Sequence, residues 1–241
     1  MTLLFGFPVT IKPHPHRERR ERHASRRRLW GRAKGKPLSA HQSNLVQELL
    51  PTLAALPGPL SHFGGAQSVS LEIGFGGGEH LLHLAKNEPN CGFIGAEPFL
   101  NGVAKTLAGI TERELDNIRI HHGDVTEVMA ALPKNSLDRI YILYPDPWPK
   151  PRHYKRRLIQ EDFIAELYRV LKPDAPLYFA SDIISYVDWA LARILRHGGF
   201  EWTAESSSNW LTPYENWPST RYEAKARREG RTPHYFTFIK A

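Results

Sequence analysis

The fold is set by the stretch from Ser68 to Lys86, SVSLEIGFGGGEHLLHLAK, in which a β-rich run leads through a glycine-rich turn into a segment of helical period. The same alternation continues along the chain. Further β-rich runs cover residues 92–96, 118–122, 137–143, 175–180, 200–204 and 235–239, and segments of helical period cover 100–110, 126–132, 159–171 and 184–196. Strands that alternate with helices predict right-handed crossovers and an α/β fold, with a doubly wound, mostly parallel seven-stranded sheet.

Length and composition are those of a globular protein. The chain has 241 residues, of which 41% are hydrophobic and 24% charged, and no apolar run approaches the roughly 18 residues of a membrane span. The apolar start of the chain is followed by basic residues rather than preceded by them, which is the reverse of a secretory signal. Cys91 is the single cysteine, and no Cys and His cluster has a metal-ligand spacing. We therefore expect a cytoplasmic protein without a membrane segment or bound metal.

Positive charge is concentrated near the N-terminus. Between Lys12 and Lys36 there are 11 Lys or Arg residues and two Glu residues, while the net charge of the whole chain is +7. Such a block predicts a poorly ordered basic N-terminal arm over residues 1–40, followed by one domain over 41–241. The arm either contacts a polyanion such as a nucleic acid or is a solvated tail.

Acidic residues recur where the predicted strands end. Their separations are each close to one strand plus one helix, and the residues are Glu72, Glu97, Asp124, Asp146 and Asp182. Because parallel strands end at one edge of a sheet, these acids should line the same rim, where ligands of such sheets bind. Each one alone could equally be a turn residue or a helix cap.

The glycine turn indicates what kind of ligand lies there. A dinucleotide fingerprint starting at Gly74 and Gly76 would need a third glycine at position 79, where the chain has Glu79. Carboxylates beside the turn disfavour a pyrophosphate and favour a cation with ribose hydroxyls, as in S-adenosylmethionine. Glu97 would then accept from the ribose and Asp124 from the adenine amino group. Spacing alone does not separate this site from an NAD site.

The segment after the fourth strand suggests the second substrate. It reads YPDPWPK over residues 144–150 and continues into a run with five Lys or Arg residues in 150–157. Alternating prolines stiffen the chain around Asp146 and Trp148. A rigid acid, an aromatic ring and adjacent cations are typical of a site for a purine in RNA. The alternative is a rigid loop that caps the sheet, with Trp148 as a core residue.

These motifs together resemble those of bacterial tRNA (guanine-N7)-methyltransferases, which are class I, S-adenosylmethionine-dependent enzymes. The resemblance covers about residues 68–239. It rests on the turn at 72–76, on 95–97 (GAE), on 123–124 (GD), on 145–150 (PDPWPK) with the basic residues up to 157, on 181–182 (SD) and on 220–223 (TRYE).

The resemblance implies a site and a partner. The partner is tRNA, methylated at N7 of a guanine in its variable loop. Contacts with the methyl donor are implied at Glu72, Gly74, Gly76, Glu97, Asp124 and Asp146, with Asp146 as the catalytic residue. Substrate contacts are implied at Lys150, Asp182, Thr220, Arg221, Tyr222 and Glu223, and RNA contacts at Arg152, His153, Lys155, Arg156 and Arg157.

Several alternatives stay open at this point. The loop around Trp210, Tyr214, Trp217 and Tyr222 either stacks on a base or packs against the sheet. The activity could be methyl transfer to another RNA, a protein or a small molecule. A nicotinamide-dependent oxidoreductase would leave the basic run and Asp146 unexplained, and a pure RNA-binding module would leave the acidic rim unexplained.

Overall fold

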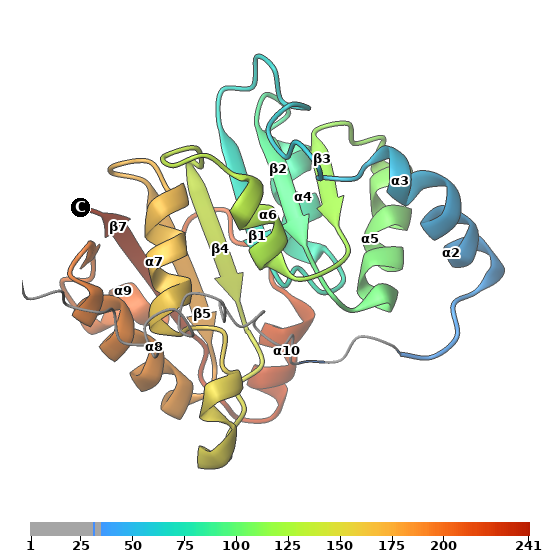
Figure 1. Ribbon diagram of the computed structural model, residues 1–241. Helices are drawn as coiled ribbons and strands as arrows, with labels where there is room; N and C mark the ends of the chain where they lie inside the picture. Colours follow the sequence, from blue (N-terminus) through green and yellow to red (C-terminus); the bar gives the residue numbers. More distant parts are fainter. Residues whose placement is uncertain (1–30, 32–34) are drawn as a thin grey trace, which may run out of the picture. The chain divides into compact units, whose positions relative to one another are not determined.

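The computed structural model describes Gly31 and residues 35–241, and the part from Gly31 onward forms one compact unit around a twisted sheet (Figure 1). The seven strands lie in the order β3-β2-β1-β4-β5-β7-β6. Their bounds are β1 Val69–Ile73, β2 Gly92–Ala96, β3 Ile118–His121, β4 Arg139–Leu143, β5 Pro176–Ser181, β6 Phe200–Trp202 and β7 His234–Lys240. The predicted α/β fold and its strands are confirmed, with ends that differ by one or two residues.

One strand runs against the others. The pairs from β3 to β5 are parallel, whereas β7 is antiparallel to both β5 and β6. In the register of that pair, His234 at the start of β7 faces Ser181 at the end of β5. The connection over residues 203–233 therefore ends at the carboxyl edge of the sheet, although it begins near the other end of β7, where Trp202 pairs with Phe238. It carries the short helices α9 (Ser207–Leu211), which packs on β7, and α10 (Arg221–Arg228).

Helices cover both faces of the sheet because its strands are apolar on both sides. One core lies between the sheet and α6 (Val125–Ala131), α7 (Glu161–Val170) and α8 (Ile184–His197). The other lies under α4 (Glu79–Asn87) and α5 (Leu100–Arg113). Figure 1 shows α6 and α7 in front of the sheet and α4 behind it. The helices cover the two faces of the sheet, so the loops that follow the parallel strands lie at its carboxyl edge.

The segment before β1 is helical but irregular. It forms α2 (Ala40–Asn44), a π-helical turn η1 (Leu45–Leu49) and α3 (Leu50–Thr52). Beyond α3 the chain pairs with the outer side of β3, since Ile120 N donates to Leu53 O at 2.8 Å and Ala55 N donates to Ile120 O at 3.0 Å. The edge strand β3 is therefore covered by backbone.

The predicted basic arm is described only at its end. Gly35 N donates to Asn101 Oδ1 at 2.9 Å, and Asn101 Nδ2 donates to Lys36 O at 2.7 Å. The backbone of residues 35 and 36 is thus hydrogen-bonded to Asn101 on α5. Residues 1–30 and 32–34 of the predicted arm lie outside the described residues.

Two features are absent from the part of the chain that the structure describes. Across Gly31 and 35–241, no helix is long and apolar enough to cross a membrane. In the same residues, no three His, Cys, Asp or Glu side chains group as metal ligands would.

Candidate active site

The glycine turn after β1 is held in place by Glu97. Gly76 N donates to Glu97 Oε2 at 2.7 Å, and Phe99 N donates to Glu97 Oε1 at 2.8 Å. Gly74 and Gly76 have φ values of 75° and 58°, in the left-handed region that favours glycine. The carboxylate after β2 therefore fixes the turn after β1, and each of its oxygens keeps a lone pair for a ligand hydroxyl.

The C-terminal segment lies directly on this turn. A Cβ atom on Gly76 would lie 3.0 Å from Arg221 Nη2 and 3.2 Å from Tyr222 Cε2. Thr220 caps α10, since its hydroxyl accepts from Glu223 N at 3.2 Å. The Tyr222 ring is 43% exposed, with the Arg221 guanidinium 5.0 Å from its centroid. Residues 220–222, implied to bind the substrate, thus meet the turn implied to bind the donor.

Asp146 stands at the same edge, in the loop after β4. The loop turns sharply, with positive φ values at Tyr144 (52°) and Trp148 (41°), and the Asp146 side chain is exposed to solvent. The protein packed around it still removes enough water to raise the pKa of the Asp146 carboxyl. Burial raises the pKa of Glu97, and the negative charge of Asp146 adds to that rise, so the two acids are electrostatic neighbours.

The other three rim acids have partners within the chain. Glu72 Oε2 lies 2.7 Å from His80 Nδ1, and Asp124 Oδ1 accepts from Thr126 N at 3.0 Å as the N-cap of α6. Asp182 Oδ2 accepts from Arg231 Nε at 2.5 Å. The expected placement at the ends of β1, β3 and β5 is confirmed. The contacts of these acids with a donor or a guanine stay predictions.

Glu223 is also engaged within the chain. It is 4% exposed, its Oε2 accepts from Trp217 Nε1 at 2.6 Å, and its Oε1 accepts from Arg227 Nη2 at 2.9 Å. Burial raises the pKa of the Tyr144 hydroxyl, and the charges of Glu223 and Asp182 act in the same direction. The first residue of the Asp146 loop therefore lies near both acids.

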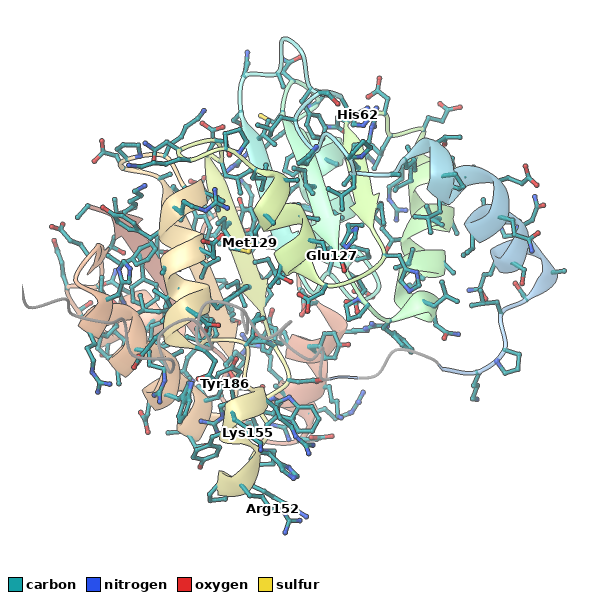
Figure 2. All side chains as sticks on the ribbon, in the orientation of Figure 1. His62, Glu127, Met129, Arg152, Lys155 and Tyr186 are labelled. Carbon is teal, nitrogen blue, oxygen red and sulfur yellow. The ribbon has the colours of Figure 1, made fainter. Side chains whose placement is uncertain are left out.

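The basic run after the loop forms the 3-10 helix η2 (Pro151–Arg156) and is largely at the surface. Lys150, Arg152 and Lys155 are exposed, and His153 and Arg156 are half-buried. Figure 2 shows Arg152 and Lys155 at the outer end of this segment. Trp148 is half-buried and packs on this helix, with the Arg156 guanidinium 4.9 Å from its ring centroid, and is not a core residue. These cations can reach an RNA backbone.

Arg157 corrects the sequence prediction. It is 0% exposed, its Nε donates to Pro147 O at 2.8 Å and its Nη1 donates to Ser185 O at 2.8 Å. Its guanidinium also lies 3.8 Å from the ring centroid of Tyr154. Arg157 is therefore a buried support of the Asp146 loop, and the prediction that it contacts RNA is wrong, because a charge run in a sequence does not reveal which cation turns inward.

The site region fits a cationic ligand with ribose hydroxyls. A Cβ on Gly74 would meet no atom within 4 Å, so open space adjoins the turn there. Glu97 faces that turn and Asp146 adds negative charge, while the left-handed glycines bring backbone close to the space. This combination fits S-adenosylmethionine, as the sequence predicted.

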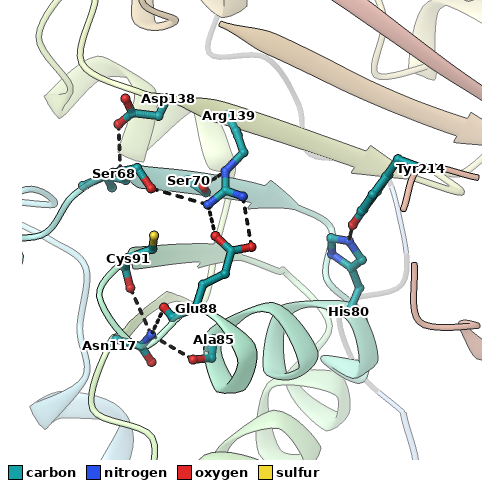
Figure 3. A network of polar contacts seen from close by, with 11 residues as sticks. Ser68, Ser70, His80, Ala85, Glu88, Cys91, Asn117, Asp138, Arg139 and Tyr214 are labelled. Atoms are coloured by element: carbon teal, nitrogen blue, oxygen red, sulfur yellow. Dashed lines mark hydrogen bonds and ion pairs between the residues drawn. The ribbon is translucent and has the colours of Figure 1, made fainter. Parts of the chain in front are cut away.

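Sequence reasoning gave no role to His80, which the structure makes a central contact. His80 is 2% exposed and bridges Glu72 and the Tyr214 hydroxyl. Figure 3 shows the second of these links, from the His80 ring to the Tyr214 hydroxyl. Tyr214 and Trp217 pack inward, with ring centroids 6.0 Å and 5.4 Å from that of His80. Of the two readings left open for this aromatic loop, packing on the sheet holds for these two residues, while Tyr222 stays exposed. A buried histidine in a helix has no periodic signal that would identify it.

Comparison with solved structures agrees with this description. The 16S rRNA methyltransferase KamB aligns with a TM-score of 0.55 at 15% identity, covering 87% of this chain and 99% of KamB. The 16S rRNA (adenine(1408)-N(1))-methyltransferase from Catenulisporales acidiphilia aligns with a TM-score of 0.52 at 18% identity, covering 87% and 97%. The chain therefore has the fold of these two solved methyltransferases.

Sequence comparison is more specific. Residues 66–236 match the family described as "Putative methyltransferase". The tRNA (guanine-N(7)-)-methyltransferase of Agrobacterium fabrum is 52% identical, covering 88% of this chain and 94% of its own. That of Brucella melitensis biotype 1 is 50% identical over the same shares. The chain belongs to the tRNA (guanine-N(7)-)-methyltransferase family.

Proposed function

We propose that this protein transfers a methyl group from S-adenosylmethionine to N7 of a guanine in tRNA. Beside the family membership, one observation carries the proposal. Arg221 and Tyr222, from the segment implied to bind guanine, lie on Gly76 of the turn implied to bind the donor. Acceptor and donor would therefore meet at one point of the carboxyl edge, where Asp146 also stands.

The chemistry asks for positioning more than for proton transfer. Guanine N7 is an exposed lone pair without a proton, so its methylation requires no base. When bound, S-adenosylmethionine supplies an electrophilic methyl group on a sulfonium. The protein has to hold N7 in line with that methyl group, which alone can lower a barrier by several kcal/mol. The methylated guanine is cationic, and the exposed carboxylate of Asp146 would stabilise the developing charge.

The residues divide into three proposed groups. The donor is held by Glu72, Gly74, Gly76, Glu97, Asp124 and Asp146. The guanine is held by Lys150, Asp182, Thr220, Arg221, Tyr222 and Glu223, with the exposed Tyr222 ring as a surface on which a base can stack. The RNA backbone is contacted by Arg152, His153, Lys155 and Arg156, where the structure leaves cations at the surface.

Three finer points belong to the same proposal. The target is a guanine of the variable loop, as the family resemblance implies. The reaction takes place in the cytoplasm, where tRNA is present, and needs no metal because the nucleophile is already a free lone pair.

The test is methyl transfer to a defined RNA. The protein is incubated with labelled S-adenosylmethionine and an unmodified tRNA transcript, which is then digested to locate the labelled nucleoside. We expect 7-methylguanosine in the variable loop and no label in a transcript whose variable-loop guanine is replaced by adenine. A 16S rRNA fragment is the control RNA. Label in the rRNA fragment alone, or on another atom of the tRNA, would contradict the proposal.

A further inference from the structure

A buried polar chain runs from the sheet to the loop before α10. Its first link joins the Glu72 carboxylate on β1 to His80 on α4, with Oε2 2.7 Å from Nδ1. Its second link is the hydrogen bond between His80 Nε2 and the hydroxyl of Tyr214, which lies 134 residues further along the chain. Glu72 and His80 are 4% and 2% exposed, so water does not compete for these bonds.

The series of polar contacts continues from Tyr214 to the segment 220–223, which is proposed to bind the guanine. The Tyr214 and Trp217 rings meet edge to face with centroids 5.2 Å apart, and Trp217 N donates to Tyr214 O at 3.3 Å. Trp217 Nε1 donates to Glu223 Oε2 at 2.6 Å, and Glu223 N donates to the Thr220 hydroxyl. The start of α10, and with it the pair of side chains on Gly76, is thereby tied to β1.

From this geometry we infer that His80 and Tyr214 are positioning residues, which hold the segment 220–223 against the glycine turn so that the guanine pocket is assembled before tRNA binds. The inference rests on the proposed function. It assigns to two residues a role in forming the acceptor site, although neither belongs to the groups that touch donor or RNA.

The protonation pattern of the chain follows from its ends. A carboxylate only accepts hydrogen bonds, so the contact with Glu72 requires the hydrogen on His80 Nδ1, and in the neutral ring Nε2 is then the acceptor for the Tyr214 hydroxyl. Burial raises the pKa of Tyr214, with the neighbouring Tyr141 and Glu72 adding to it, so the hydroxyl stays protonated and remains a donor. Each bond has a fixed direction, which a buried network needs in order to specify one geometry.

A second contact on the same helix supports the role of α4 as the anchor of this loop. His83, one turn after His80, has its Nε2 3.0 Å from the Asn216 carbonyl oxygen. This outer contact is exposed, whereas the contact of the buried His80 ring with the Tyr214 hydroxyl is partly buried. Since exposed hydrogen bonds compete with water, the less exposed link should contribute more to fixing the loop.

The decisive variant is Tyr214→Phe, which removes one hydroxyl and keeps the ring. Tyr178→Phe is the matched control, because its ring stacks on Tyr141 in the same cluster and, among the described residues, its hydroxyl has no hydrogen-bond partner. We expect Tyr214→Phe to raise the KM for tRNA about 10-fold, with kcat changed less than about 3-fold, since leaving His80 Nε2 unsatisfied loosens the loop. Donor affinity should stay within about 2-fold of wild type, as should every parameter of Tyr178→Phe.

A double-mutant cycle tests whether His80 and Tyr214 act through their hydrogen bond to each other or stabilise the loop independently. The cycle adds His80→Phe and the double variant His80→Phe/Tyr214→Phe. If the residues act as one chain, the double variant raises the tRNA KM no more than His80→Phe alone. Additive effects, or an unchanged tRNA KM in Tyr214→Phe, would overturn the inference. Wild-type protein that methylates no tRNA would instead refute the proposed function, so the two failures are distinguishable.

Discussion

The Arg157 guanidinium donates to the carbonyl oxygen of Pro147 at 2.8 Å, directly after Asp146 in the chain. Through its bonds to Ser185, the same group ties the loop to α8. The last cation of the basic run thus points inward and supports the loop that carries the acid, while Lys150, Arg152 and Lys155 are exposed. Stability and RNA binding can therefore be separated by substitutions within one short segment.

Substitution of Arg157 should affect folding. Arg157→Met keeps the length of the side chain but leaves the Pro147 and Ser185 carbonyls without their donor, so we expect the free energy of unfolding to fall by about 2–4 kcal/mol. Arg152→Met, at an exposed position of the same run, should change it by less than about 0.5 kcal/mol. Urea unfolding measures the free energy of unfolding of both variants. Equal stabilities of the two variants would show that the buried bonds contribute nothing.

Substitution of the outward cations should affect the salt dependence of tRNA binding. Each cation that neutralises a phosphate contributes roughly one unit to the slope of log affinity against log salt. Lys155→Ala and Arg152→Ala should therefore each reduce that slope by about one, with unchanged thermal stability. Lys86→Ala, at an exposed position at the end of α4, is the control and should leave the slope unchanged. A wild-type slope in Lys155→Ala would remove Lys155 from the RNA-contacting group.

Two glycines with the same backbone conformation test the donor site. Gly74 and Gly198 both have φ of 75°, and a Cβ on either would meet no atom within 4 Å. Replacement by Ala should destabilise the fold at each position by about 1 kcal/mol, because both adopt the left-handed conformation. Only Gly74→Ala should weaken S-adenosylmethionine binding, by about 10-fold or more, since its methyl group would enter the proposed site. Calorimetric titration measures the affinity for S-adenosylmethionine. Equal affinities in the two variants would contradict the assignment of Gly74 to the donor site.

Asp146 should be essential for transfer but not for folding. Asp146→Asn should lower the transfer rate by about 100-fold or more, because the amide cannot offset the developing positive charge. The protein packed around Asp146 removes part of the water from its carboxyl and raises its pKa, so the ionised form destabilises the folded state above that pKa. The variant should therefore melt at a higher temperature than wild type at pH 8. The difference should shrink as pH falls through the raised pKa and vanish below about 4, where the carboxyl is protonated in both states.

The pH dependence of ligand binding gives an independent check on Asp146. Affinity for S-adenosylmethionine should fall as pH is lowered through the raised pKa values of Asp146 and Glu97, because protonation removes the charge that attracts the sulfonium. S-adenosylhomocysteine, whose sulfur is neutral, should lose less affinity over the same range. Parallel curves for the two ligands would show that neither carboxylate faces the sulfonium.

The strands and the rim acids were predictable because their signals are periodic. Apolar runs identify the strands, and a carboxylate that directly follows one, such as Asp146, is carried to the carboxyl edge by the geometry of parallel sheets. The reversal of β7 was not predictable, since pairing direction depends on where the connection over 203–233 lies. That reversal is also what brings residues 220–222 over the glycine turn.

The direction in which an individual side chain points was the second feature that could not be predicted from the sequence. Arg157 and Lys155 are chemically alike in the sequence, and their opposite orientations follow from the tight 3-10 turn and from the apolar residues Leu158 and Ile159 that come next. His80 owes its role to Tyr214, a partner too distant in the chain for any local spacing to indicate. Side-chain partners at such separations are set by tertiary packing, which a single sequence does not encode in local form.

The backbone pairing of Leu53 and Ala55 with Ile120 has a consequence beyond the fold. An open sheet ends in strands with unpaired amides, which recruit strands of other molecules and promote aggregation. Here the β3 edge is occupied by the segment that follows α3, and the opposite edge strand, β6, is only three residues long. The protein thus protects itself against intermolecular strand addition at both sides of its sheet, which suits an enzyme that has to remain dispersed among its large polyanionic substrates.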